Sequence, residues 1–180
     1  MEKVVLRADC AQCAALCCIA LSFDRSSLFA IDKALGQACP HLDACGGNCT
    51  IHSRRAELGF RGCIEFDCLG AGQRVTQQMF KGRSWITDQS LLVPMCRAFI
   101  AVLRAHECLL LLREAQGLPL SSFDRQRLAE LQMAIENADA SIQLIEALKS
   151  KTSIFLTSLR SYFKDDWRGN PRQIGPSERG

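Results

Sequence analysis

Cysteine constrains what this chain can fold into more than any other residue. The sequence has 180 residues and eleven cysteines, and nine of the cysteines lie between positions 10 and 68. Thiols this dense indicate either a disulfide framework or a metal site, and the redox compartment decides between the two. The nine cysteines are Cys10, Cys13, Cys17, Cys18, Cys39, Cys45, Cys49, Cys63 and Cys68.

The compartment is inferred from what the sequence lacks. The first nine residues carry mixed charge, and no apolar run is followed by a small-residue cleavage pattern, so we expect no secretory signal. The most apolar later stretch, residues 99–112, is too short and too charged to cross a membrane. We therefore expect a cytoplasmic protein without membrane contact. Thiols stay reduced in that compartment, and reduced thiols at this density predict bound metal.

The spacing of the first cysteine group suits a metal ion. Cys10 and Cys13 are three residues apart, so a tight turn can bring both sulfurs to one ion. Cys17 follows four residues later, about one helical turn. Cys18 points about a third of a turn away and could serve a second ion or the other edge of a cluster. Four thiolates complete a zinc site or hold a four-iron cluster, so one or two metal sites remain possible.

Four cysteine motifs follow one another along the chain. They read C-A-Q-C-A-A-L-C-C, C-P-H-L-D, C-T-I-H-S-R-R and G-F-R-G-C-I-E-F-D-C. Their order over about residues 8–70 resembles the family of zinc- or iron-chelating proteins with a C-x-x-C-x-x-x-C-C cluster. The resemblance implies bound zinc or an iron–sulfur cluster in a bacterial cytosol. It implies no settled activity, although a flagellin lysine methylase is similar in its cysteine cluster.

The resemblance also implies a ligand set. The metal ligands that it assigns are Cys10, Cys13, Cys17, Cys18, Cys39, Cys49, Cys63 and Cys68. Cys45 has no counterpart in the family pattern, and we expect it to be dispensable. The chain also departs from the family at Arg54-Arg55, where an Arg-Pro pair is usual, and in a longer segment before Cys63.

The identity of the metal follows less directly from the sequence. Eight thiolates exceed the needs of one zinc ion, and a vicinal cysteine pair is unusual in a zinc finger, so an iron–sulfur cluster of the 4Fe–4S type is favoured over zinc. His52 and His41 could ligate, but such histidines more often bond to a sulfur or sit in a turn. Residues 70–73 are expected to let the backbone approach cluster sulfurs rather than cradle a phosphate. The arginines at 54, 55 and 61 are expected to form a solvated face.

The second half of the chain predicts helices. A heptad-like apolar stripe predicts a helix over about 91–116, ended by Gly117 and Pro119. A second stripe predicts a helix from Ser121 or Ser122 to near Ser150, and a short third helix is expected over 154–163. The two stripes comprise Met95, Phe99, Val102, His106 and Leu109, and then Leu128, Leu131, Ile135, Ala138, Ile142 and Ile145. We expect His106 to be a satisfied polar residue, and Cys96 and Cys108 to be packing residues.

These patterns predict a mainly α protein in two parts. Residues 1–90 should form an irregular, cysteine-rich, metal-bound part, because such segments bury too little apolar surface to fold without a metal. Residues 91–165 should form an antiparallel helical hairpin plus a short third helix, and residues 166–180 a flexible tail.

Three functional hypotheses follow. The first is a metal-binding protein with an iron–sulfur cluster or zinc, whose helical hairpin docks a protein partner or a second copy. The second is a metal-dependent redox or methyltransferase-like protein-modifying enzyme. The third is a zinc-dependent nucleic-acid-binding module, which is the least favoured. The net charge is only +3, and no aromatic residues interleave with the basic group to support base stacking.

Overall fold

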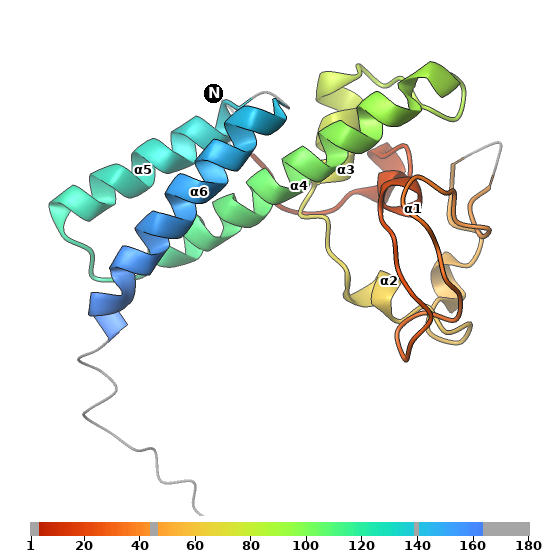
Figure 1. Ribbon diagram of the computed structural model, residues 1–180, viewed down its shortest axis with the longest axis horizontal. Helices are drawn as coiled ribbons and strands as arrows, with labels where there is room; N and C mark the ends of the chain where they lie inside the picture. Colours follow the sequence, from red (N-terminus) through yellow and green to blue (C-terminus); the bar gives the residue numbers. More distant parts are fainter. Residues whose placement is uncertain (1–3, 44–46, 139–140, 164–180) are drawn as a thin grey trace, which may run out of the picture.

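A computed structural model describes residues 4–43, 47–138 and 141–163 of the chain (Figure 1). These residues are mainly helical, as predicted. Across them no β-strand forms, and two isolated bridges join Phe23 to Lys33 and Leu42 to Cys49. An irregular amino-terminal part is followed by long helices, which confirms the predicted fold class. Cys45 and the predicted tail lie outside the described residues.

Regular elements in the amino-terminal part are short. The longest helix here has six residues, and loops connect most of the elements. In chain order the elements are η1 (Cys10–Gln12), α1 (Leu16–Ala20), η2 (His52–Arg54), α2 (Gly62–Glu65), α3 (Ala71–Gln73), the π-helical η3 (Arg74–Met79) and η4 (Gln89–Leu91). The predicted irregularity of this region is therefore found.

Helix α4 (Leu92–Ala115) runs through both halves of the molecule (Figure 1). Its predicted boundaries are confirmed to within one residue. Every member of its predicted stripe is buried: Met95, Phe99, Val102, His106 and Leu109. The amino-terminal half of α4 packs against α1, α3 and Trp85, and the other half packs against α5 and α6. One helix thus contributes to two hydrophobic cores, and the expected division at residue 90 falls just before it.

The second long helix ends earlier than predicted. Helix α5 (Ser122–Glu136) begins at Ser121, whose hydroxyl accepts a hydrogen bond from the Asp124 amide at 3.1 Å, as expected for an N-cap. It stops at Asn137, and the predicted continuation to Ser150 is wrong. A distant side chain satisfies one of the carbonyls at this end, because the Arg74 guanidinium donates to the carbonyl of Glu136 at 3.0 Å.

The third helix is longer than predicted. Helix α6 (Ile142–Ser158) starts at the N-cap Ser141 and continues through Ser150 into the 3₁₀ turn η5 (Leu159–Phe163). The Ser150 hydroxyl donates to the Glu146 carbonyl at 3.0 Å, so it bonds within the helix and does not end it. The separate helix expected over 154–163 is therefore the end of α6. The side chains of Ile142 and Phe163 lie outside the described part.

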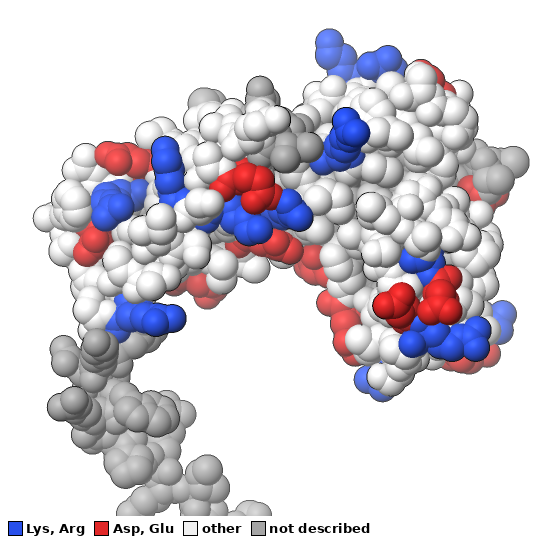
Figure 2. All heavy atoms as spheres, in the orientation of Figure 1, with Lys and Arg blue, Asp and Glu red and all other residues white. Residues whose placement is uncertain are grey.

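The three long helices α4, α5 and α6 pack together with short connections (Figure 1). Between residues 4 and 163, as far as they are described, no helix is both long and apolar enough to cross a membrane. The face in Figure 2 carries basic and acidic side chains intermixed, with wide neutral stretches between them. That face therefore offers no broad basic surface of the kind that polyanions favour.

Candidate metal centre

The vicinal cysteines lie on the short helix α1. Ala15 precedes this helix in a left-handed conformation (φ 51°), which turns the chain sharply after the Cys13 region. The sulfurs of Cys17 and Cys18 are 4.0 Å apart. Two thiolates on a tetrahedral zinc ion, with Zn–S bonds of about 2.3 Å, lie about 3.8 Å apart. The pair is thus close to the separation that one metal ion requires.

A second group of thiols comes from η1 and from the loop before α3. The Gln73 amide links these segments, because its oxygen accepts from the Asp9 amide at 2.9 Å and its nitrogen donates to the Arg7 carbonyl at 2.7 Å. Burial raises the pKa of the Cys10 thiol, and negative charge on Cys17 and Cys68 raises it further. Four predicted ligands from three segments, Cys10, Cys13, Cys17 and Cys68, are therefore electrostatic neighbours.

Helix α3 approaches one of these sulfurs with its bare backbone. A Cβ atom on Gly72 would lie 2.4 Å from the Cys13 sulfur, so only glycine leaves room for the thiol there. The turn before it needs glycine too, since Gly70 has φ 79° and a Cβ would lie 2.6 Å from the Val5 carbonyl oxygen. This agrees with the expectation that residues 70–73 bring backbone close to the cysteines. Burial raises the pKa of Cys13 to about 12.

Of the remaining predicted ligands, Cys39 and Cys49 lie in the loop region between α1 and α2, and Cys63 lies on α2. The Cys39 amide donates to the Cys18 carbonyl at 3.0 Å, which ties this loop directly to α1. Burial raises the pKa of Cys63 to about 11, and negative charge on Cys17, Cys39 and Cys49 adds to the shift. Cys17 is thus an electrostatic neighbour of both groups.

An arginine braces the Cys63 loop. The Arg55 guanidinium donates to the Cys63 carbonyl at 2.8 Å and to the His52 carbonyl at 2.9 Å. Its positive charge also lowers the pKa values of Cys10 and Cys63 against the effect of burial. The prediction of a solvated basic face holds for Arg54 and Arg61, whose ion pairs are exposed. It is wrong for Arg55, which is half-buried and donates to two backbone carbonyls. The sequence pattern does not show the contact with Cys63, because the fold brings that carbonyl to Arg55.

The predicted ligands are thus electrostatic neighbours in smaller groups, but the described part of the chain does not gather them into a metal site. Among the residues that the structure describes, no three His, Cys, Asp or Glu side chains are placed to hold one metal ion. Burial is the largest cause of the raised pKa at Cys10, Cys13, Cys39 and Cys63, so these thiols stay protonated until a cation displaces the proton. The donor set, thiols without carboxylates, suits zinc or an iron–sulfur cluster.

The cysteines and histidines outside the predicted ligand set lie in different surroundings. Cys108 is buried in the core between α4 and α6, as expected of a packing residue. Cys96 packs at the edge of the other core. His52 is exposed, and the His41 ring packs edge-on to Phe60 with centroids 5.0 Å apart.

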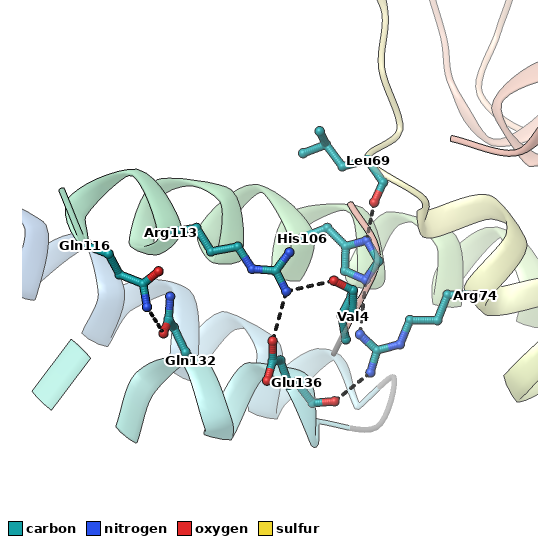
Figure 3. A network of polar contacts seen from close by, with 8 residues as sticks. All are labelled: Val4, Leu69, Arg74, His106, Arg113, Gln116, Gln132 and Glu136. Carbon is teal, nitrogen blue, oxygen red and sulfur yellow. Dashed lines mark hydrogen bonds and ion pairs between the residues drawn. The ribbon is translucent and has the colours of Figure 1, made fainter. Parts of the chain in front are cut away.

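His106 is fully buried, and both its ring nitrogens have partners (Figure 3). Nδ1 donates to the Leu69 carbonyl at 2.6 Å, and Nε2 accepts from Arg74 at 3.1 Å, so the imidazole is neutral. The expectation of a satisfied polar residue is confirmed. Because Leu69 directly follows Cys68, this histidine joins the cysteine region to α4.

The same junction contains an ion pair. Arg113 donates to the Glu136 carboxylate at 3.0 Å and to the Val4 carbonyl at 2.7 Å (Figure 3). Arg74 reaches the end of α5 from the opposite side. The segment around Val4, the end of α5 and η3 therefore meet beside α4 in one polar network. No local sequence pattern predicts this network.

An apolar groove of about 420 Å³ lies where α1, the following loop and α4 meet. Apolar side chains dominate its lining, and Arg97, Arg104 and Glu146 add charge. Arg104 and Glu146, which both line the groove, form an ion pair with each other.

Comparison with known proteins gives one relative and no function. No protein-family model matches the chain, and no solved structure matches it. The chain is similar to YybG, an uncharacterized protein of Bacillus subtilis, with 38% identity over 116 residues. The match covers 64% of this chain and 41% of YybG, so the chain spans less than half the length of this relative.

Proposed function

We propose that the chain is a metal-binding protein that holds an iron–sulfur cluster, or zinc, through cysteine thiolates. The observation that supports the proposal is that cysteines from motifs spread over residues 10–68 are electrostatic neighbours of one another, and that the Cys17 and Cys18 sulfurs on α1 lie 4.0 Å apart. A chain gains nothing obvious by bringing so many thiols to one half-exposed region. A soft cation with several coordination positions gives a reason, because it replaces the thiol protons and cross-links the loops.

The predicted ligands are the eight cysteines of the motif set, and the number and spacing of these thiols favour a 4Fe–4S cluster over zinc. When bound, the metal would supply charge and cross-linking, and a cluster would also supply a one-electron couple. The protein side holds the thiols in place through Gln73, Arg55 and the Gly72 backbone. Membership in the cysteine-cluster family is part of this proposal.

The direct test is purification without oxygen, followed by metal and sulfide analysis and a visible absorption spectrum. An iron–sulfur protein should contain iron and acid-labile sulfide in similar amounts and absorb broadly at about 400 nm, through sulfide-to-iron charge transfer. A zinc protein should contain zinc and lack that band. Protein without metal, in which every thiol titrates as free, would refute the proposal.

The proposed setting is the cytoplasm of a bacterium. The ten cysteines within the described residues are all free thiols, which suits a reducing compartment. The proposed partner is a protein or a second copy that binds the helical part. Several large apolar side chains on α4, α5 and α6 are exposed, which supports such a contact. They are Val93, Leu111, Phe123, Met133, Leu144 and Ile154.

A second candidate, a metal-dependent protein-modifying enzyme, is favoured by the groove beside α1 and α4. Its volume of about 420 Å³ is within the range of small-molecule sites. Binding of S-adenosylmethionine to the metal-loaded protein, measured by calorimetry, would favour this candidate. Absence of binding would leave the docking protein as the better account.

A further inference from the structure

Lys33 is a buried cation that lies, in the sequence, between the Cys17-Cys18 pair and Cys39. Only 3% of its surface is exposed. Backbone carbonyl oxygens surround its ammonium group: those of Gln37 at 2.8 Å, Ile19 and Ala34 at 3.4 Å each, and Leu21. The Phe23 ring centroid is 5.7 Å away. Lysine is almost never buried this deeply unless a charge partner offsets the loss of hydration.

The usual partner of a buried lysine is a carboxylate. Within the described residues, no aspartate or glutamate forms an ion pair with Lys33. Carbonyl dipoles satisfy the donors of an ammonium group, but they leave its net charge without an anion. The position would therefore be costly unless another source of negative charge is close.

The local backbone identifies that source. Ile19, whose carbonyl faces the ammonium group, directly follows Cys18. Gln37 lies two residues before Cys39, and the Cys39 amide is bonded to the Cys18 carbonyl at 3.0 Å. The ammonium group is thus held between two predicted ligand segments. Burial lowers the pKa of Lys33, and negative charge on four thiols opposes that shift: Cys39, Cys18, Cys96 and Cys17.

We propose that Lys33 is the counter-charge of the thiolate centre and that the occupied centre keeps a net negative charge. The inference rests on the proposed function. Four thiolates around one zinc ion carry a net charge of about −2, and a 4Fe–4S²⁺ cluster with four thiolates carries the same. A fixed ammonium group beside such a centre offsets this charge in a region with little water, where charge interactions are strong.

The competing explanation is structural. The carbonyls of Ile19 and Leu21 end helix α1, so Lys33 could act only as a cap for the helix that bears Cys17 and Cys18. The two accounts differ in what they require of the side chain. A cap needs hydrogen-bond donors, and glutamine supplies them. A counter-charge needs a cation, which arginine supplies and glutamine does not.

The test uses the full chain, prepared metal-free under anaerobic conditions, with Zn²⁺ alone as the probe. The zinc dissociation constant is measured by competition with a chromophoric chelator for the wild type, Lys33→Gln, Lys33→Arg and Lys151→Gln. Lys151 is exposed on α6, far from the cysteines in the sequence, and serves as the matched control. We expect Lys33→Gln to weaken zinc binding about tenfold or more, since one unit charge is lost at short range. Lys33→Arg and Lys151→Gln should stay within about threefold of the wild type.

Each outcome of this test supports or overturns the proposed role of Lys33. Equal affinity of the wild type and Lys33→Gln would overturn the counter-charge role. Equal weakening in Lys33→Gln and Lys33→Arg would overturn it too, because the effect would then follow the shape of the lysine side chain and not its charge. Failure of the wild type to bind zinc or iron at all would be a different result: it would refute the proposed function, and the role of Lys33 with it.

Discussion

The two ends of α4 pack against regions that are held together in different ways. At its carboxyl end, α4 meets two helices of 15 and 17 residues, and their apolar stripes supply a core. At its amino end it meets α1, α3 and loops, where no helix exceeds six residues among those that the structure describes. Most of the predicted ligand cysteines lie in the second region, half-buried among irregular loops.

This difference teaches where stability must come from. Stripes at helical spacing bury apolar area efficiently, so the helical end needs only its own side chains. The cysteine region contributes α1, α3 and Trp85 to a core with α4, but its loops bring few such stripes and are held largely by isolated hydrogen bonds such as that between Gln73 and Asp9. A metal that cross-links several loops would supply what packing does not.

The largest expected effect follows from removing the metal. A structural zinc site contributes about 10–16 kcal/mol in small zinc-binding peptides, so chelation should loosen the cysteine region while α5 and α6 persist. Because α4 belongs to both cores, its amide protons near Met95 should exchange faster after chelation, and those near Leu112 should not. Hydrogen exchange read by mass spectrometry, with circular dichroism for total helix, measures both.

Some results of this experiment would contradict the difference between the two ends of α4. If chelation abolishes the whole helical signal, the two ends of α4 form one cooperative unit, and the junction around His106 and Arg113 transmits the loss. Uniform exchange along α4 would lead to the same conclusion. Unchanged exchange near Met95 would mean that the cysteine region is stable without metal.

A smaller effect is expected at the junction. Burial, together with the positive charges of Arg74 and Arg113, lowers the pKa of His106 to about 4 against the effect of the hydrogen bond to Leu69. The folded protein therefore binds fewer protons here than the unfolded chain. Its stability should be fully present above about pH 6.5 and should fall as the pH drops toward 4.

Replacing this histidine should remove that pH dependence. We expect His106→Asn to lose about 1–3 kcal/mol at neutral pH, because partners in the buried network are left unsatisfied. Its stability should then change less than that of the wild type between pH 6.5 and 4. Denaturant unfolding at several pH values measures both proteins, and metal loss common to both cancels in the difference. Parallel curves for the two proteins would show that His106 does not titrate in this range.

The sequence predicts the helical end better than the cysteine end, for a physical reason. The bounds of α4 and the cap at Ser121 follow from local patterns, and both were found. The contact at the end of α5 could not be predicted, because its donor, Arg74, is more than sixty residues away. Ser150 was a misleading stop signal for a related reason, since its hydroxyl bonds back within the helix.

At the candidate site, the motifs predict which thiols bind metal, and that ligand set stays a prediction, because no three of these side chains in the described part of the chain are placed to hold one ion. The groups around them were missed. Lys33 and Arg55 look like surface residues in the sequence, and only the fold shows the carbonyls that surround their charged groups. A lysine between two cysteine motifs is a weak signal, which could have raised the question of charge balance but not answered it. Cys45, which we expect to be dispensable, lies outside the described residues.

The central claim is that the motif cysteines hold metal and the helix cysteines do not, and one measurement tests it most directly. The metal-to-protein ratio is determined for the wild type, Cys13→Ser, Cys63→Ser and Cys108→Ser, all purified without oxygen. Metal should fall sharply in the first two variants, because each loses a soft anionic ligand. Cys108→Ser should keep the wild-type ratio and lose only about 1–3 kcal/mol of stability for a buried hydroxyl. Full metal content in Cys13→Ser and Cys63→Ser, or loss of metal in Cys108→Ser, would contradict the account.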